Sequence, residues 1–370
     1  MSFRLLILTP GFPRDESDTS CIPALQDFVL GWKEYHPEIQ VKVISFQYPH
    51  KEKIYRWNGI EAYAAGGKDR KSFFRQKTWR RVNRKLKEWC SDQTIMISYF
   101  LTEATYVGLR FSLRKNIPLL AIAAGQDVRK QNRYLELLKI TKPEIVCFNE
   151  RMAEELFHSA GIRPDYIIPM GVSNVPHRIA DAVTRSIDVL SAGSLTPIKQ
   201  IDRALKIISE VKIDFPFLKT EIVGDGSERK HLESIDRELH LKSTVRFTGS
   251  IKREQVIEKM QRAKILLHTS AYEGQSTVIS EALTCGMTVV CFDVGRIADQ
   301  VFSPAGKKKI YVCRDEDEMV ATLRKLLTDQ QLDFSPVIPF TMHDTVNEYW
   351  QILSRFKLGN AISVSSGRGS

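Results

Sequence analysis

The sequence has few cysteines, and none is placed as a metal site or a disulfide framework would require. Its six cysteines are scattered, no two form a CxxC pair, and no two histidines have the spacing of zinc ligands. We therefore expect neither a metal centre nor a disulfide framework. The reducing cytoplasm is the compartment that this cysteine usage indicates.

Long hydrophobic runs are also missing. A run such as IPLLAIAA (117–124) is far shorter than the ~20 apolar residues that span a bilayer. The first residues, MSFRLLILTPGFP, lack a basic n-region and lead straight into a Pro/Gly turn, so we expect a first strand there and no signal peptide. No GxGxxG follows an early strand, which argues against a dinucleotide-dependent dehydrogenase.

Positive charge is concentrated in one part of the chain. The net charge is +10, and residues 51–90 hold 13 Lys and Arg against 4 Asp and Glu, a surplus of 9. Within that window Trp79, Val82, Leu86 and Trp89 recur at helical spacing. Two interpretations remain open: a packed amphipathic helix with a solvated basic face, or a basic surface (68–87) that meets anionic lipid or an anionic acceptor. No nucleic-acid-binding motif accompanies the charge, so we expect no nucleic-acid partner.

The second half of the chain alternates short apolar runs with amphipathic segments. The apolar runs predict strands at 187–192, 219–224, 244–249, 263–268, 288–292 and 309–313. The amphipathic segments predict helices at about 201–213, 227–240, 253–262 and 276–285. This alternation is typical of an α/β domain with a doubly wound parallel sheet and helices on both faces.

The first half repeats the scheme with longer excursions. We predict strands at 4–9, 41–45, 94–98, 118–123, 144–148 and 166–170, and helices at 22–35, 104–115 and 150–161 in addition to the basic one. The length fits two domains. Their predicted bounds are 1–175 and 186–340, joined by a linker at 171–186 and followed by an amphipathic helix (343–357) and a flexible tail (358–370). Open α/β sheets bind ligands at the carboxyl ends of their strands, so we expect the site there, in a cleft between the domains.

The stretch HTSAYEGQSTVISEALTCGMTVVCFDVG (268–295) places two glutamates around a predicted helix start. Glu273 lies in the loop after a strand, and Glu281 lies two turns into the helix. Ser276 is the expected N-cap residue, and Gly286 the expected stop. The amides near Gln275, Ser276 and Thr277 would suit a phosphate, and the carboxylates could accept bonds from hydroxyl groups. Two solvated surface glutamates remain the alternative explanation.

Two further strand-to-helix turns carry compatible groups. VLSAGSLTPIKQIDRAL places Lys199 at a helix start, where it could neutralise a diphosphate or simply be exposed. IVGDGSERKHLE places Gly224 and Gly226 at another turn, where the missing side chains would let backbone approach a ligand. An anion site flanked by hydroxyl acceptors matches the needs of a sugar nucleotide.

In order and spacing, these segments resemble the retaining glycosyltransferases of family 4, which have the GT-B fold of two Rossmann-like domains. The matching phrases are SAGSLTPIKQID, IVGDGSERKHL, VRFTGSI and the stretch from 268 to 295. The first half matches more loosely, through LTPGFP, AAGQDV and FNERMAEELFHSAG…IIPMGV. The final helix resembles the one that crosses back to the first domain in that fold.

The resemblance implies roles for individual residues. Glu273 would contact the donor sugar near its reacting carbon, Glu281 would hold the ribose hydroxyls, and Lys199 would neutralise the diphosphate. Gly11 would lie in a first-domain loop that approaches the phosphates. The other implied donor-binding residues are Gly193, Ser194, Gly224, Gly226, Thr248, Gly249, Gly274, Gln275, Ser276 and Thr277.

The sequence departs from the family pattern at several positions. Ser194 stands where the family usually has an arginine. The family phrase HG.D appears as Ala124–Asp127 without its histidine, so a catalytic contact to the sugar would pass to Asp127. Residues 15–23 replace the usual glycine pair of the first loop, and Asp299 replaces a glutamate. One phosphate-neutralising charge is therefore absent.

The predicted function is transfer of a sugar from a nucleoside diphosphate sugar to a hydroxyl acceptor with retained configuration. The expected acceptor is a glycan or a lipid-linked molecule, in polysaccharide, lipopolysaccharide or glycolipid synthesis. No aspartate pair is placed as a metal bridge in the DxD manner, so we expect no metal and no cofactor beyond the donor substrate. We expect a cytoplasmic protein that can lie at the inner face of the membrane.

Two other classes of protein compete with this prediction. A glycosidase also uses two carboxylates, but it does not need an anion site beside them. A non-catalytic nucleotide-sugar or glycan-binding partner of a membrane-associated synthesis complex would explain the missing arginine and histidine.

Overall fold

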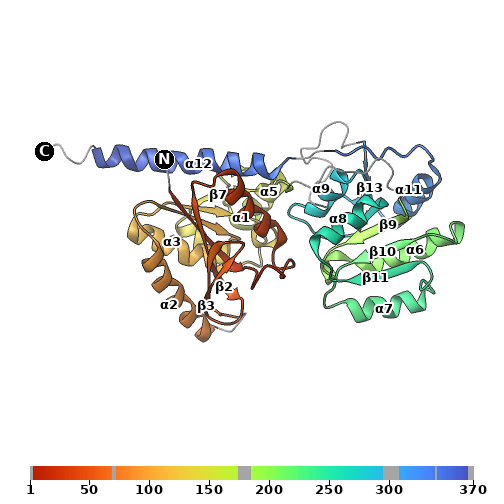
Figure 1. The fold of residues 1–370 in the computed structure, drawn as a ribbon, viewed down its shortest axis with the longest axis horizontal. Coiled ribbons are helices and arrows are strands. Elements are labelled where there is room, and N and C mark those ends of the chain that lie inside the picture. Colours follow the sequence, from red (N-terminus) through yellow and green to blue (C-terminus); the bar gives the residue numbers. More distant parts are fainter. Residues whose placement is uncertain (1–2, 69–71, 174–184, 295–307, 338–339, 366–370) are drawn as a thin grey trace. The chain divides into compact units, whose positions relative to one another are not determined.

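The computed structural model describes residues 3–68, 72–173, 185–294, 308–337 and 340–365. The chain forms two compact units (Figure 1). The first unit joins Met1–Ser173 to Met342–Ser370, and the second is Asn174–Thr341. The predicted domains 1–175 and 186–340 differ from Met1–Ser173 and Asn174–Thr341 by no more than 12 residues at any bound, and most of the predicted linker, 174–184, lies outside the described residues.

The first unit is built on an eight-stranded sheet of order β3-β4-β2-β1-β5-β6-β7-β8. All neighbouring strands run parallel except β3 and β4. The strands are β1 (Arg4–Gly11), β2 (Gln40–Tyr48), β3 (Lys53–Trp57), β4 (Ile60–Ala64), β5 (Thr94–Tyr99), β6 (Leu119–Ile122), β7 (Glu144–Cys147) and β8 (Tyr166–Ile167). The residues of β5 are all buried, as expected of a central strand covered on both faces.

The antiparallel hairpin of β3 and β4 is missing from the sequence-based prediction. Asn58 and Gly59 join its strands with φ of 48° and 79°. A two-residue turn with both φ values positive matches the twist of a hairpin, and Asn-Gly is its preferred sequence. The hairpin signal was therefore present in the sequence, within the basic window 51–90.

Among the described residues of the first unit, six α-helices accompany the sheet. They are α1 (Pro23–Tyr35), α2 (Ser72–Trp89), α3 (Glu103–Lys115), α4 (Tyr134–Ile140), α5 (Glu150–Ala160) and α12 (Met342–Ser365). The short α4 was not predicted. In α2 the predicted apolar side is confirmed at Val82, Leu86 and Trp89, which are buried. Arg81 and Arg84 of the same helix pair with Glu52 at 2.8 and 3.0 Å.

Helix α12 packs on α1, on the face of the sheet opposite α2 and α3 (Figure 1). Trp350 stacks on His36 with ring centroids 4.5 Å apart, and Tyr349 is fully buried against Phe28. Gly31 permits this approach, because a Cβ there would lie 2.7 Å from Met342 Cγ. The prediction of a flexible tail from 358 was wrong as far as Ser365, because the helix continues to that residue; 366–370 lie outside the described residues.

The second unit has a six-stranded parallel sheet of order β11-β10-β9-β12-β13-β14. Its strands are β9 (Ile187–Ala192), β10 (Thr220–Val223), β11 (Val245–Gly249), β12 (Ala263–His268), β13 (Thr288–Phe292) and β14 (Ile310–Cys313). Each agrees with a predicted strand to within one residue at either end. The strand order reverses direction between β9 and β12, and such a switch point is where doubly wound sheets bind ligands.

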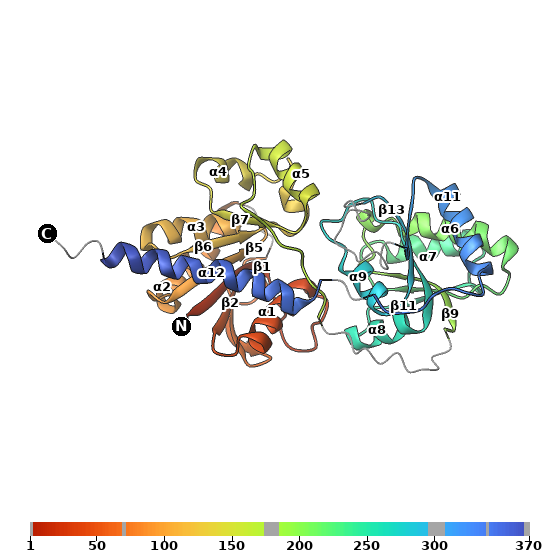
Figure 2. The ribbon, with the colours of Figure 1, turned by 90° about the horizontal axis from the view of Figure 1, so that it is seen from above.

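The helices of the second unit cover both faces of its sheet (Figure 2). One apolar cluster joins the sheet to α6 (Ile201–Asp214), α7 (Arg229–Glu238) and α11 (Glu316–Thr328), and another joins it to α8 (Arg253–Gln261) and α9 (Thr277–Thr284). Helix α11 was not predicted. The doubly wound α/β class is thereby confirmed for this unit.

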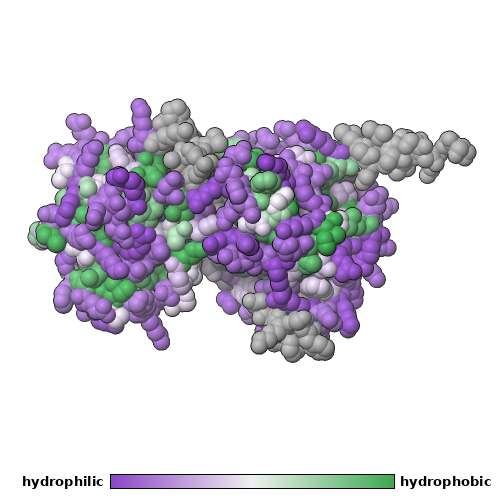
Figure 3. Space-filling model, turned by 180° about the vertical axis from the view of Figure 1, so that it is seen from behind, coloured by the Kyte–Doolittle hydropathy of each residue, from purple (hydrophilic) through white to green (hydrophobic). Residues whose placement is uncertain are grey.

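On the face drawn in Figure 3, hydrophilic side chains predominate and the hydrophobic ones form small separate patches. Across the described ranges, no helix combines the length and the apolar character that crossing a bilayer requires.

Candidate functional site

The loops after β9 and β12 meet at the switch point of the second sheet. The loop after β9 ends in a short 3-10 turn, Pro197–Lys199. The backbone amide of Ala271 donates to the carbonyl oxygen of Ile198 at 2.8 Å, and Thr269 Oγ1 donates to the carbonyl oxygen of Lys199 at 3.1 Å. These bonds fix Lys199 beside the loop that carries Glu273.

Lys199 and Glu273 form an ion pair in this corner, with Lys199 Nζ 2.5 Å from Glu273 Oε1. Their side chains are 21% and 11% exposed. Glu273 is therefore not the solvated surface glutamate of the alternative explanation. The structure brings together two residues that are 74 positions apart in the sequence and were predicted to serve one site.

His268, the last residue of β12, is a third member of this cluster. Its Nε2 lies 3.2 Å from Glu273 Oε1 and 3.5 Å from Ser276 Oγ, and the residue is 5% exposed. Burial alone would raise the pKa of Glu273, but the hydrogen bond from His268 and the charge of Lys199 outweigh it and lower that pKa to about 2. Glu273 is thus ionised at neutral pH.

Helix α9 begins directly beyond this cluster. Ser276 is its N-cap residue as predicted, although its side chain makes no capping bond. Gly286 follows the helix with φ of 76°, which confirms the predicted stop. Gly274 and Ser276 are buried, while Gln275 and Thr277 are partly exposed. The N-terminal end of α9 carries the partial positive charge of the helix dipole next to the Lys199–Glu273 pair.

Glu281 lies on the second turn of α9 and has its own basic partner. Arg253, the first residue of α8, places Nη2 2.5 Å from Glu281 Oε1, and the two side chains are 28% and 13% exposed. Each glutamate of the predicted pair is therefore held by a basic side chain of a different element.

The loops after β9, β10 and β11 pack closely against one another at four glycines, Gly193, Gly224, Gly226 and Gly249. A Cβ on Gly224 would lie 1.9 Å from the carbonyl oxygen of Gly193, and one on Gly226 would lie 2.3 Å from that of Leu195. Gly224 also bridges Gly249, whose carbonyl oxygen accepts its amide at 3.0 Å. These backbone contacts are sufficient to explain why glycine is needed at positions 224 and 226. The close approach of a ligand to these glycines remains a prediction.

The remaining predicted residues of the second unit border the same edge. Gly193 has φ of 149°, and a Cβ there would lie 3.7 Å from Lys199 Cε. Ser194 is exposed. Thr248 Oγ1 donates to the carbonyl oxygen of Gly249 at 3.0 Å. Asp299 lies outside the described residues.

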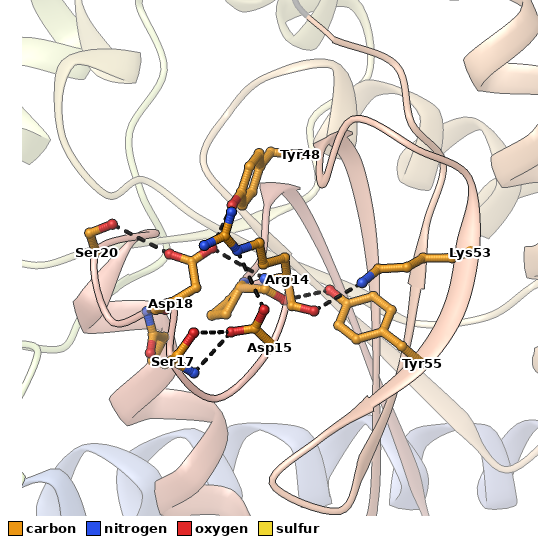
Figure 4. Close-up of polar contacts among 10 residues, drawn as sticks. Arg14, Asp15, Ser17, Asp18, Ser20, Tyr48, Lys53 and Tyr55 are labelled. Atoms are coloured by element: carbon orange, nitrogen blue, oxygen red, sulfur yellow. Dashed lines mark hydrogen bonds and ion pairs between the residues drawn. The ribbon is translucent and has the colours of Figure 1, made fainter.

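In the first unit, Gly11 ends β1 and begins a loop that side chains hold tightly (Figure 4). Tyr48 OH donates to Asp18 Oδ2 at 2.6 Å, and Tyr55 OH donates to the carbonyl oxygen of Pro13 at 2.7 Å. Lys53 Nζ donates to the carbonyl oxygen of Arg14 at 3.0 Å. The loop is therefore anchored to β3 through Pro13 and Arg14 and to β2 through Asp18, which lies in the stretch (15–23) that replaces the expected glycine pair.

Asp127 serves the backbone of the first unit. Its Oδ2 accepts from the amide of Leu101 at 2.7 Å, and both oxygens accept from the amide of Ala124 at 3.2 Å. Burial raises the pKa of Asp127 to about 6, although these amides favour the charged form. The geometry gives Asp127 a structural role that joins two loops, and it does not support the predicted catalytic contact, which remains a prediction.

Comparison with known proteins addresses the second unit most directly. The sequence profile described as "Glycosyl transferases group 1" matches residues 177–335. The second unit belongs to this family. This confirms the resemblance to glycosyltransferases, and we call the second unit the group 1 unit from here on.

Curated relatives match about half of the chain. The gpi3 subunit of the Schizosaccharomyces pombe phosphatidylinositol N-acetylglucosaminyltransferase is 26% identical over 227 residues, which cover 58% of this chain and 48% of that protein. A Campylobacter jejuni enzyme, named N-acetylgalactosamine-N,N'-diacetylbacillosaminyl-diphospho-undecaprenol 4-alpha-N-acetylgalactosaminyltransferase, is 24% identical over 207 residues, 54% of this chain and 55% of that one. The chain thus spans about half the length of these relatives.

Solved structures extend the likeness to both units. Anabaena Alr3699/HepE in complex with UDP and glucose matches with a TM-score of 0.64 and 16% identity, covering 98% of this chain and 100% of that one. At this identity the likeness concerns the fold, and it confirms the predicted GT-B class of two α/β domains.

Sequence reasoning missed two residues of the group 1 unit, His268 and Arg253. A polar residue at the carboxyl end of an apolar strand was a usable signal for His268, because such positions lie at the ligand edge of a parallel sheet. For Arg253 no local signal exists, since only packing brings it to Glu281, 28 residues away. Within the described ranges, no three His, Cys, Asp or Glu side chains are grouped as metal ligands.

Proposed function

We propose that this protein is a retaining glycosyltransferase that uses a nucleoside diphosphate sugar. The observation that carries the proposal is the Lys199–Glu273 pair beside the start of α9, at the switch point of the group 1 unit. A cation, a helix N-terminus and an ionised carboxylate would then contact the diphosphate and the donor sugar. Glu281 would bind the ribose hydroxyls.

Catalysis would rest on stabilising the nucleoside diphosphate as it leaves. Negative charge grows on the bridging phosphate oxygen as the bond to the sugar carbon breaks. A cation and the dipoles of a helix N-terminus stabilise this charge, and they lower the barrier most when they need little rearrangement. The ion pair with Glu273 keeps Lys199 beside the start of α9, from where its flexible side chain can turn toward a diphosphate. We propose that no metal is needed, which predicts full activity in the presence of EDTA.

The relatives suggest where to look for the substrates. Two relatives transfer N-acetylated hexosamines according to their names, and one of those names includes a diphospho-undecaprenol acceptor. We propose UDP-N-acetylhexosamines as the first donors to test, and a glycan or lipid-linked molecule as acceptor.

The test measures release of nucleoside diphosphate from a panel of nucleotide sugars, with lipid-linked and glycan acceptors. Release that depends on acceptor, with the anomeric configuration of the product retained by NMR, would support the proposal. Donor-induced thermal stabilisation without any turnover would instead indicate a binding protein, and inverted configuration would contradict the retaining assignment.

We further propose that α2 brings the protein to an anionic surface, at the inner face of the membrane. Lys77, Arg80 and Lys87 of this helix are exposed, in contrast to Arg81, which pairs with Glu52. Binding to anionic vesicles should weaken as salt rises, because exposed charges are screened. Replacing the three exposed residues with glutamate should abolish it. No binding to such vesicles at low salt would contradict the proposal.

A further inference from the structure

His268 occupies a place that the proposed chemistry has not yet used. It ends β12, the strand beside the switch point, and its side chain is 5% exposed. A buried imidazole requires partners for its nitrogens. For Nε2 these partners are Glu273 Oε1, at 3.2 Å in the loop after β12, and Ser276 Oγ, at 3.5 Å at the start of α9.

The contact with Glu273 determines the tautomer. An ionised carboxylate has no hydrogen to give, so its oxygens only accept. The Lys199 ammonium lies 2.5 Å from the same Oε1 and favours the carboxylate form of Glu273, so the Nε2 of His268 carries the hydrogen and donates it. His268 is thus a fixed donor to the same oxygen, Oε1, that Lys199 contacts.

The two donors differ in what else they can do. Lys199 has a flexible four-carbon side chain that is 21% exposed, so it can turn toward a bound diphosphate. His268 is enclosed at the end of a central strand and cannot leave. When Lys199 is shared with a phosphate, His268 remains to hold the carboxylate.

We infer that His268 is a positioning residue, which keeps Glu273 oriented and ionised while Lys199 serves the donor diphosphate. This inference rests on the proposed function for its catalytic meaning, since His268 acts through Glu273. The contact itself can be tested without turnover. His268 therefore matters when the sugar reacts more than when the donor binds.

The test compares two substitutions at one position. His268→Gln places a side-chain NH2 at the same number of bonds from Cβ as Nε2 of histidine, whereas His268→Leu has no donor. With Leu, turnover at saturating donor should fall about 10- to 100-fold, as misplacement of a reacting group does, while the donor KM changes little. Gln should restore most of the loss. His231→Leu, at an exposed position of the same unit, is the matched control.

A second measurement does not depend on activity. The 13C carboxyl signal of Glu273, assigned by its loss in Glu273→Gln, reports the titration of that group. In His268→Leu the titration midpoint of Glu273 should move to higher pH, because the carboxylate loses a hydrogen-bond donor. In His268→Gln the midpoint should remain near the wild-type value. Should Leu prevent folding, Asn serves in its place, since its amide is one bond too short to reach.

The outcomes separate the inference from the proposed function. The role of His268 would be overturned if the titration midpoint of Glu273 were unchanged in His268→Leu. It would also be overturned if His268→Gln and His268→Leu lost turnover equally. A KM effect without a turnover effect would overturn it too. Failure of the wild-type protein to release nucleoside diphosphate, with the midpoint shift still present, would overturn the proposed function alone.

Discussion

Glu273 shows how a carboxylate that is only 11% exposed remains charged in this fold. Burial opposes its charge, yet His268 and Lys199 both contact Oε1 and lower its pKa to about 2. Glu281 forms an ion pair with Arg253, whose Nη2 lies 2.5 Å from Oε1. At the scale of single residues, the candidate site is therefore two carboxylates fixed by basic partners, and that pairing yields two predictions.

The first concerns Lys199. Replacing it with alanine should lower turnover about 10²- to 10³-fold, the usual effect of removing one group that stabilises developing charge. The measurement is nucleoside diphosphate release at saturating donor. Lys206→Ala removes a side chain that is 61% exposed in the same unit and should have no effect. Full activity of Lys199→Ala would contradict its assignment.

The second concerns pH and stability. The pKa of Glu273 is about 2 in the folded protein against an ordinary 4.5, so its charge stabilises the fold above pH 4.5, and that stability is lost as the pH falls toward 2. The unfolding free energy of the wild type, relative to Glu273→Gln, should therefore drop by about 2 kcal/mol between pH 6 and pH 3. Denaturant titrations of both proteins measure this. A difference that stays constant over this range would show that the carboxylate is not held as described.

At the scale of elements, turns between strands and helices do most to shape the site. Gly224 lets the strand ends of β9 and β10 lie backbone on backbone, since a Cβ there would be 1.9 Å from the carbonyl oxygen of Gly193, and its amide also bonds to Gly249 at the end of β11. The hairpin of β3 and β4 has a similar function in the first unit, because Lys53 and Tyr55 of β3 hold the loop after β1.

Gly224→Ala should therefore destabilise the group 1 unit by about 3 kcal/mol or more, since its Cβ would lie 1.9 Å from a carbonyl oxygen at a φ of 135°. Gly193→Ala is the matched comparison, with a φ of 149° but 3.7 Å of space. It should cost only the backbone strain, about 1–2 kcal/mol. Denaturant unfolding measures both values. Equal losses would show that the close contact is relieved elsewhere.

At the scale of the whole molecule, the chain leaves the first unit and returns to it through α12. Tyr349 of α12 is fully buried in the first unit, and the group 1 unit has apolar clusters of its own. Because each unit has its own hydrophobic core, we expect the two units to unfold in separate transitions.

Tyr349→Ala should lower the stability of the first unit by about 3–5 kcal/mol through the cavity it leaves. Leu323→Ala, at a fully buried position of α11, should lower that of the group 1 unit by about 2–5 kcal/mol. In calorimetry each variant should shift a different transition. A single transition that both variants shift alike would mean that the units unfold together.

The sequence by itself determined the alternation of strands and helices, because buried parallel strands need continuous apolar runs and amphipathic helices need a regular period. It also determined the ends of α9, where serine and glycine mark the boundaries. Local patterns carry no information about partners far apart in the chain. Only the tertiary structure, by bringing the loops after β9 and β12 to one switch point, decided that Lys199 and His268 share Glu273, and that Arg253 holds Glu281. It likewise assigned Asp127 to its own backbone, since the chain fold alone determines which amides surround a carboxylate.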